Sequence, residues 1–398
     1  MPPIAPAVSV QVSPAAEKSI KKGHPWVYAD AVLKTSREAE AGDIAAIFGA
    51  KREFIGLGLY DPTSPIRIRI LSTKPKTTID EVWLKTAIQN SIAKRQHLID
   101  DKLTDGFRLI HGENDGLPGL VADVYRNVLV IKLDTAAWMP HLELICDIFK
   151  ELISPLTIIL RLSRTVSPQN AYSDGCLLYG KPVNSAVVFS ENDILFEADP
   201  VNGQKTGFFL DQRDNRARAG KLAKGREVLN IFAYNGGFSL YTAKGGAKSV
   251  ISLDIAPQAL EAAKRNFALN PDLSCPHETL CADAFEAMKK LADNGRKFGM
   301  VIVDPPSFAR KQADVPNALS AYEKLTKLAL NLTANDGILI CASCSARVGA
   351  DVFFDTVLKC VKRSGRRFKE IERTLNAPDH PVGFPEGAYL KCIYIKFS

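Results

Sequence analysis

An aspartate and a cysteine each follow a short apolar run that is typical of a buried strand. Asp304 follows residues 300–303, which are all apolar, the pattern of a parallel strand that is covered on both faces. Pro305 and Pro306 come next, and because proline has no backbone N–H the strand cannot continue. Asp304 is therefore expected at the carboxyl end of a strand, where open α/β sheets bind ligands. The alternative is a solvated aspartate in a rigid turn.

Cys344 lies at the end of a second apolar run, residues 337–345. An arbitrary strand cysteine is more often an inert buried side chain than a reactive one. Two features favour reactivity here: Ser343 and Ser345 flank the thiol, and the sheet order expected for this architecture can place it beside Asp304. A thiolate can add covalently to an electrophilic carbon, so a thiol beside a carboxyl group indicates nucleophilic catalysis.

Other strand ends carry groups that can bind a nucleoside. Residues 228–240 are typical of an apolar strand that runs into the glycine turn at 236–237 and then a helix. The next strand ends in Asp254, which could accept both hydroxyls of a ribose diol. Asp283 follows a further strand and could accept an adenine amino group. Because the chain has neither the G-x-G-x-x-G fingerprint nor a P-loop, the pattern favours a nucleoside without phosphates, such as S-adenosylmethionine.

Length and composition set broad limits. A chain of 398 residues favours two or three domains, and 46% hydrophobic with 24% charged residues is ordinary for a globular protein. The net charge of +7 permits a polyanionic partner without requiring one. No window approaches 18 consecutive apolar residues, so we expect no membrane span. The amino terminus lacks the features of a secretory leader, which favours the cytoplasm.

Cysteine usage argues against a metal site. Of the eight cysteines, one pair, Cys341 and Cys344, has C-x-x-C spacing. Structural zinc needs four ligands, so we expect no metal and free thiols in a reducing compartment.

The amino-terminal part has the texture of a small β-barrel. Residues 8–73 contain short strands broken by turns. In residues 66–70, isoleucines alternate with Arg67 and Arg69, so one face of that strand should be apolar and the other cationic. A solvated surface is the favoured interpretation of these arginines.

The next part favours an α+β domain. Thr78 and Glu81 have the spacing of a capping box, which predicts a helix that runs to about Asp100. Arg126 and Asn127 separate two apolar runs and predict a hairpin. The remaining predicted elements are a helix near 141–153 and strands at 157–162 and 193–197.

From about residue 199 strands and helices alternate, which predicts an α/β domain. The segment 205–226 holds seven basic and two acidic residues, with Phe208 and Phe209 among them. An exposed, solvated helix is slightly favoured over a surface for stacking and phosphate contact.

The chain resembles the bacterial 23S rRNA cytosine-5 methyltransferases of the RlmI type over nearly its whole length. The motifs that carry the resemblance are GHPWVY (23–28), ENDGLPGL (113–120), NGQKTGFFLDQRDNR (202–216), NIFAYNGGF (230–238), DPPSF (304–308), SCS (343–345) and DHPVGFPEGAYLK (379–391). The resemblance implies a β-barrel PUA domain at 1–74, an α+β middle domain at 75–200, and a class I, Rossmann-like, doubly wound methyltransferase domain at 201–398. It also implies 23S rRNA as the partner, and the sequence is compatible with a homodimer.

The resemblance further implies roles for individual residues. Cys344 is expected to add to C6 of a cytosine and so make C5 nucleophilic, while Asp304, protonated or sharing a proton with N3, stabilises charge on the ring. The target base must be unstacked from the RNA to reach the pocket. The cofactor S-adenosyl-L-methionine is expected to contact Phe209, Gln212, Asn230, Phe232, Tyr234, Gly236, Asp254, Asp283 and Asp304. Other RNA cytosine-5 methyltransferases carry a second cysteine near their D-x-P motif, whereas residues 305–307 here contain no thiol.

Three other functions are open, and one sequence feature or more argues against each of them. A guanine-N7 rRNA methyltransferase resembles the DPPSF region but is asparagine-rich where this chain has SCS, so Cys344 favours cytosine. A non-catalytic RNA-binding or assembly protein would have no use for Asp254, Asp304 and Cys344. A small-molecule methyltransferase would have no use for a PUA-like domain or for the basic stretches 205–226 and 359–373.

Overall fold

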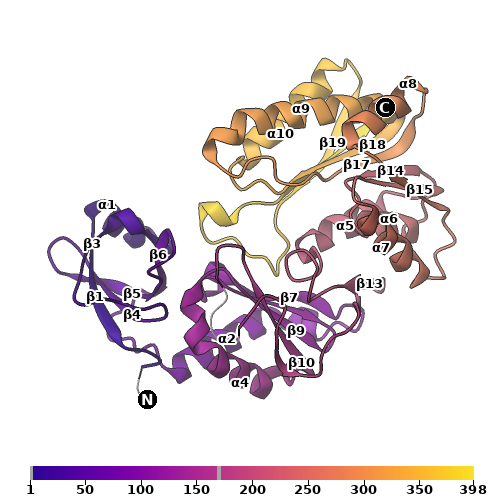
Figure 1. Ribbon diagram of the computed structural model, residues 1–398. Coiled ribbons are helices and arrows are strands. Elements are labelled where there is room, and N and C mark those ends of the chain that lie inside the picture. The colour runs from indigo at the N-terminus through magenta and orange to yellow at the C-terminus, as the bar shows by residue number, and fades with distance from the viewer. Residues whose placement is uncertain (1–2, 168–171) are drawn as a thin grey trace. The chain divides into compact units, whose positions relative to one another are not determined.

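The computed structural model describes residues 3–167 and 172–398, which form two compact units (Figure 1). Unit 1 comprises Met1–Ser190, Ala198–Leu210 and Pro378–Phe384, and unit 2 comprises Glu191–Glu197, Asp211–Ala377 and Pro385–Ser398. Within the described residues, no helix combines the length and the apolar character needed to cross a membrane. The division into three domains at residues 74 and 200 stays a prediction.

The first part of unit 1 is a six-stranded sheet with the order β2-β6-β5-β4-β1-β3. Its elements are β1 (Ala7–Val12), α1 (Pro14–Lys21), β2 (Trp26–Tyr28), β3 (Val32–Thr35), β4 (Ile44–Phe48), β5 (Phe54–Tyr60) and β6 (Ile66–Ser72). Alternate side chains of β1, namely Val8, Val10 and Val12, are fully buried in its core, as expected for a strand with one apolar face.

The prediction of a solvated cationic face on β6 is wrong for Arg69. This arginine is 4% exposed, and its guanidinium donates to the backbone carbonyls of Ile66 and Asp134 at 3.1 and 3.4 Å. Because burial desolvates the ion, it lowers the pKa of Arg69, although Glu113 and Asp61 oppose that effect. Alternation on a strand predicts which side chains share a face but not what covers that face.

The second part of unit 1 is a five-stranded sheet with the order β11-β10-β9-β8-β7. Its elements are α2 (Glu81–Lys94), α3 (Gln96–Ile99), β7 (Gly106–His111), β8 (Leu120–Tyr125), β9 (Val128–Leu133), α4 (Leu142–Ile153), β10 (Thr157–Leu162), β11 (Leu177–Gly180) and β12 (Val187–Ser190). The predicted hairpin is confirmed, since β8 and β9 pair in antiparallel fashion from Leu120 with Leu133 to Tyr125 with Val128.

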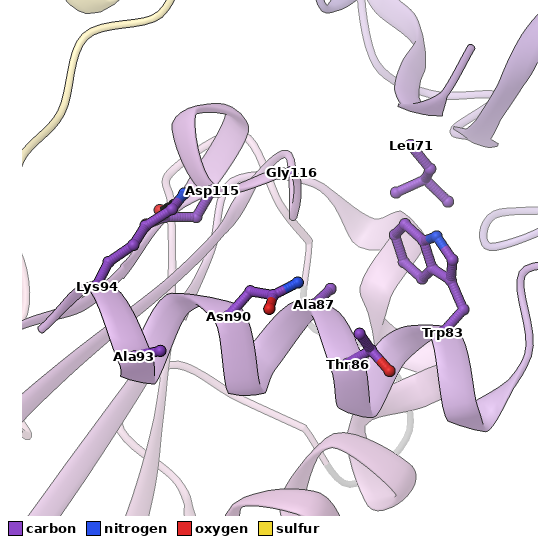
Figure 2. A pocket seen from close by; sticks show the side chains of 9 residues that line it. All are labelled: Leu71, Trp83, Thr86, Ala87, Asn90, Ala93, Lys94, Asp115 and Gly116. Carbon is purple, nitrogen blue, oxygen red and sulfur yellow. Dashed lines mark hydrogen bonds and ion pairs between the residues drawn. The ribbon is translucent and has the colours of Figure 1, made fainter. Parts of the chain in front are cut away.

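The helix predicted after residue 77 is confirmed, but its predicted cap is wrong. Asp80, not Thr78, is the N-cap of α2, and its carboxylate accepts from the backbone N–H of Trp83 at 2.8 Å. A groove of about 630 Å³ runs along this helix, with Trp83 and Leu71 toward one end and Lys94 with Asp115 at the other (Figure 2). Lys94 and Asp115 form an ion pair at 3.0 Å, so the charged groups of this lining are already paired.

A segment from the far carboxyl-terminal part of the chain completes unit 1. Pro378–Phe384 lies within unit 1, although the strands on either side of it in the sequence belong to unit 2. The backbone carbonyl of Asp379 accepts from buried Arg95 at 2.9 Å, and its carboxylate accepts from the backbone N–H of Arg108 at 3.1 Å. Phe384 contacts Trp26 with ring centroids 5.0 Å apart. The motif at 379–391 therefore contributes to both units.

Unit 2 is built on a seven-stranded sheet with the order β16-β15-β14-β17-β18-β20-β19. The seven strands are β14 (Glu227–Ile231), β15 (Ser249–Asp254), β16 (His277–Cys281), β17 (Phe298–Val303), β18 (Thr333–Ser343), β19 (Phe368–Thr374) and β20 (Lys391–Phe397). Strand β13 (Leu195–Ala198) lies outside this sheet and pairs with β12. The helices of unit 2 are α5 (Arg213–Lys221), α6 (Gly237–Lys244), α7 (Pro257–Ala268), α8 (Ala284–Asp293), α9 (Val315–Leu332) and α10 (Ala350–Arg363). Strands β14 to β18 are parallel, and β20 is antiparallel to β18 and β19.

Two cores cover the faces of this sheet. Helices α8, α9 and α10 cover one face (Figure 1). Their apolar side chains share a core with Leu229, Val301 and Leu339 of the central strands. On the other face, α5 and α6 pack against the strand side chains that point the opposite way, such as Val228 and Met300. Because both faces are buried, the central strands are continuous apolar runs, as the sequence indicates at 300–303.

The interpretation of the basic segment 205–226 as a solvated helix is wrong for Arg213 and Arg216, whereas Lys205, Lys221 and Lys224 are exposed. Helix α5 starts at Arg213, and both Arg213 and Arg216 are buried. Arg216 forms a two-pronged ion pair with buried Glu191, at 2.9 and 2.7 Å. A buried arginine needs such a partner, and the sequence gives no sign that Glu191, 25 residues upstream, supplies it.

Candidate active site

The parallel strands of unit 2 bring the predicted acids to one edge of the sheet. Asn230 of β14 is in register with Ser252 of β15 and with Ile302 of β17. Asp254 ends β15 and Asp304 follows β17 directly, so both lie at the carboxyl edge beside the turn after β14. This is the place where a doubly wound sheet binds its ligands.

The turn after β14 has an unusual backbone that Asp254 holds in place. Phe232 and Tyr234 adopt left-handed conformations, with φ angles of 60° and 48°, and Gly236 has φ 81°. Such conformations cost free energy at non-glycine residues and persist where the surroundings hold them. The Asp254 carboxylate accepts from the backbone N–H of Tyr234 at 2.8 Å and from that of Ala256 at 2.9 Å.

Gly236 cannot be replaced by a larger residue without displacement of its neighbours. It precedes α6, and a Cβ atom at this position would lie 3.0 Å from the Cβ of Ala263 on α7. The glycine is thus required both by its positive φ and by the close approach of α7.

Asp283 follows β16 at the same edge, because Cys281 of β16 is in register with Asp254. It is the N-cap of α8, and its carboxylate accepts from the backbone N–H groups of Phe285 and Glu286 at 2.9 and 3.1 Å. One carboxylate oxygen makes both of these bonds, so the cap uses one side of the group.

Gln212 contacts Asp304 directly. Its side-chain amide nitrogen donates to Oδ2 of Asp304 at 2.9 Å, and its amide oxygen accepts from Asn215 at 2.6 Å. The second bond fixes the orientation of the amide, so Gln212 presents a donor to the carboxyl group. Phe209 belongs to unit 1, where the Lys205 ammonium lies 4.4 Å from its ring centroid, and its role at the cofactor stays a prediction.

Cys344 lies next to the loop that begins at Asp304. It follows β18, which pairs with β17 through Val303 and Cys341, and its Sγ contacts the backbone carbonyl of Pro305 at 3.8 Å. The side chain is partly exposed, whereas Ser343 and Ser345 on either side are fully buried. A carboxyl group and an accessible thiol therefore follow adjacent strands.

Comparisons with known proteins decide the family. The family model for S-adenosylmethionine-dependent methyltransferases matches residues 107–396, and the model for PUA-like domains matches residues 10–73. The chain belongs to the S-adenosylmethionine-dependent methyltransferases. The cofactor of this methyltransferase is accordingly S-adenosyl-L-methionine, and the predicted fold class is confirmed.

Individual relatives match the methyltransferase from end to end. It is 45% identical to a ribosomal RNA large subunit methyltransferase of Deinococcus radiodurans, over 99% of this chain and 98% of the relative. It is 35% identical to ribosomal RNA large subunit methyltransferase I of Alteromonas mediterranea, over 97% of this chain and 98% of the relative. A methyltransferase structure solved in complex with SAH superposes with a TM-score of 0.84 at 23% identity, covering 98% of this chain and 99% of that chain, and shares the fold.

The strand-end edge of the methyltransferase fits its cofactor. Asn230 is 1% exposed and donates to Ser239 at 2.9 Å, but its Oδ1 atom is buried and has no hydrogen-bond partner among residues 3–167 and 172–398. A buried carbonyl oxygen normally has a donor, so a ligand with an amino or hydroxyl group would satisfy it. With Asp254 and Asp283 along the same edge, the donor and acceptor pattern suits an aminoacyl nucleoside.

Two residues that the sequence did not single out hold the turn around Cys344. The Tyr322 hydroxyl of α9 lies 2.8 and 2.9 Å from the side-chain oxygens of Ser343 and Ser345. The Lys391 ammonium of β20 donates to the backbone carbonyls of Ser345 and Tyr389 at 2.6 and 3.0 Å. Lys391 ends the last motif of the family resemblance, and its position between apolar Leu390 and Cys392 is the one sequence signal of burial.

Proposed function

We propose that the protein methylates C5 of a cytosine in 23S rRNA. The observation that carries the proposal is the placement of the Cys344 thiol next to the Asp304 loop, at the edge of the sheet that fits the cofactor. Two relatives that match the whole chain carry names of ribosomal RNA large subunit methyltransferases, and the PUA-like part at residues 10–73 suits an RNA substrate. Since rRNA is made and modified in the cytoplasm, the protein acts there.

The chemistry follows from the side chains at this edge. Bound S-adenosylmethionine supplies a methyl group that is electrophilic because it is attached to a sulfonium. The Cys344 thiolate forms a bond to C6 of the cytosine, and the electron pair of the C5–C6 double bond moves to C5, which becomes nucleophilic. After C5 carries the methyl group, the C5 proton passes to water and the electron pair of that C–H bond re-forms the C5–C6 double bond. The C6–S bond breaks at the same time, and the thiolate leaves with its electron pair.

Asp304 contacts the pyrimidine ring in this proposal, and its neighbours hold Asp304 or bind the cofactor. The Asp304 carboxyl group shares a proton with N3 and so stabilises the charge that develops when the thiolate adds. Gln212 holds this carboxyl group through its amide at 2.9 Å. Asp254 and Asp283 accept from the ribose hydroxyls and the adenine amino group of the cofactor, and Asn230, Phe232, Tyr234 and Gly236 form the wall beside them.

The experiment is methyl transfer from labelled S-adenosylmethionine to rRNA, followed by nucleoside analysis. We expect 5-methylcytidine with the wild-type protein and at least about a 10³-fold lower rate with Cys344→Ala, because the covalent route is lost. Cys275→Ala is the matched control: Cys275 lies before β16, at the opposite edge of the sheet, so its loss should leave the rate unchanged.

Other products would contradict the proposal. Methylguanosine would identify a guanine methyltransferase. No binding of S-adenosylmethionine in calorimetry would favour an RNA-binding scaffold. Sedimentation of the purified protein tests the homodimer, which stays a prediction.

A further inference from the structure

Lys391 is a buried lysine of unit 2, on the strand next to the edge strand β19. It is the first residue of β20, where it pairs with Ser343 of β18, and its relative exposure is 0%. Its ammonium donates to the backbone carbonyls of Ser345 and Tyr389 at 2.6 and 3.0 Å. The two bonds and the strand pairing hold Lys391 against both residues that flank Cys344.

Lys391 differs from the buried arginines in its partners. Arg95, Arg108 and Arg216 each form an ion pair with a buried carboxylate. Across residues 3–167 and 172–398, no ion pair joins Lys391 to a carboxylate. A buried cation without a counter-ion is costly, and titratable groups with perturbed pKa values cluster at functional sites.

The group whose charge acts on Lys391 is the Cys344 thiol. Burial lowers the pKa of Lys391 to about 8, and the negative charge of an ionised Cys344 acts in the opposite direction. Since a pKa of about 8 lies above neutral pH, the amine is largely protonated there. The same attraction, seen from the sulfur, favours the thiolate over the thiol.

We propose that Lys391 is a positioning residue for the nucleophile, whose ammonium group fixes the turn after β18 and stabilises the Cys344 thiolate by its positive charge. The proposal rests on the proposed function of Cys344. When the thiol ionises, the S–H bond breaks heterolytically and the proton passes to solvent, which reaches the partly exposed side chain. The thiolate then keeps the electron pair that forms the bond to C6.

Two other titratable groups face Cys344 from neighbouring elements. Asp304 directly precedes Pro305, whose backbone carbonyl lies 3.8 Å from the Cys344 Sγ, and an ionised carboxylate there would oppose the thiolate. Tyr322, from α9, is a neutral phenol because burial raises its pKa, and its hydroxyl bonds to Ser343 and Ser345. Lys391 therefore supplies the favourable charge, whereas Tyr322 supplies position alone, and the two roles can be separated by substitution.

The test is the pH dependence of Cys344 alkylation in the full-length protein. The protein is treated with iodoacetamide between about pH 6 and pH 10, the range that brackets thiol ionisation. The peptides that contain Cys344 and exposed Cys281 are then quantified by mass spectrometry. We expect the midpoint for Cys344 to lie below that for Cys281 in the wild type. Lys391→Met, which keeps the length of the side chain and removes the charge, should raise the Cys344 midpoint by about one pH unit or more.

Tyr322→Phe is the matched control, since it removes the hydrogen bonds to both serines without a change of charge, and its midpoint should stay near that of the wild type. An unchanged midpoint in folded Lys391→Met would overturn the proposal. If circular dichroism shows that this variant does not fold, the wild type decides: a Cys344 midpoint at or above that of Cys281 contradicts the proposal. Because the assay needs no rRNA, a wrong assignment of the methylated base would leave its result unaffected.

Discussion

Charged groups at the carboxyl edge of the unit 2 sheet have different partners from two buried arginines of unit 1. In unit 1, Arg95 forms an ion pair with Asp115 and Arg108 with Asp123, each at 2.7 Å. At the carboxyl edge of the sheet in unit 2, Asp254 accepts from backbone N–H groups and Lys391 donates to backbone carbonyls. Charges that neutralise one another complete a fold, whereas charges held by neutral groups keep the capacity to act on a ligand or a nucleophile.

The largest effect on stability is expected when the buried ion pair of Arg95 and Asp115 is broken. Burial raises the pKa of Asp115, but hydrogen bonds from Arg95, His111 and Lys94 and the positive charge of Arg95 outweigh it and lower that pKa. Asp115→Asn should reduce the free energy of unfolding by about 3–5 kcal/mol, because it leaves the Arg95 guanidinium buried without a counter-ion. Urea denaturation measures this change.

An exposed ion pair provides the control for Asp115→Asn. Glu261 and Lys264 of α7 lie 2.7 Å apart with half or more of each side chain exposed. Glu261→Gln should change the free energy of unfolding by less than about 1 kcal/mol. Equal losses in the two variants would remove the distinction between buried and exposed pairs.

A series of hydrogen-bonded neutral side chains in unit 2 should have a smaller, pH-dependent effect on the free energy of unfolding. The series runs from Asn230 through Ser239 and Ser252 to His277, with successive distances of 2.9, 2.7 and 2.8 Å. Burial lowers the pKa of His277 to about 4. The unfolded chain binds this proton near pH 6.5, so the free energy of unfolding should fall by about 2 kcal/mol as the pH drops from about 6.5 to about 4.

Comparison of the wild type with His277→Gln isolates that contribution. Glutamine can still hydrogen-bond to Ser252 but does not titrate. The wild type should therefore lose about 2 kcal/mol of unfolding free energy relative to His277→Gln as the pH falls from about 6.5 to about 4. A difference that stays constant from neutral pH to about pH 4 would show that His277 is not held neutral.

The smallest expected effect is on cofactor affinity. Asp254→Asn should weaken S-adenosylmethionine binding about tenfold, or roughly 1.4 kcal/mol, because an amide accepts through one oxygen where a carboxylate accepts through two. Calorimetry gives the dissociation constant. Asp283→Asn is the comparison, since asparagine is as good an N-cap for α8 and its loss of affinity should be the weaker of the two. Unchanged affinity in Asp254→Asn would show that the Asp254 carboxylate does not bind the cofactor.

The sequence predicted the polar groups at strand ends because that pattern is local. An apolar run that stops at Asp304 or Asp254 is visible without knowledge of any neighbour, and parallel strands then bring such residues to one edge. The contacts of Gln212 with Asp304 and of Lys391 with Ser345 join residues 92 and 46 positions apart, and no spacing rule encodes them.

Cations were the least predictable part of the sequence. Three arginines lie in segments whose sequence favours a solvated surface, but the fold buries each of them: Arg69, Arg213 and Arg216. Whether a charged side chain is exposed depends on the partner that the fold supplies, such as Glu191 for Arg216. The cap of α2 shows the same limit at short range, because Thr78 and Asp80 both suit the role and the carboxylate takes it.

The central claim is that Cys344 bonds covalently to a cytosine ring. The most direct measurement uses rRNA transcribed with 5-fluorocytidine in place of cytidine, incubated with the protein and S-adenosylmethionine and separated under denaturing conditions. Because fluorine at C5 cannot leave as a proton does, the thiolate is not released, and we expect a stable protein–RNA adduct at the peptide that contains Cys344. The account is contradicted if no adduct forms while the same preparation methylates ordinary rRNA, or if Cys344→Ala forms the adduct equally well.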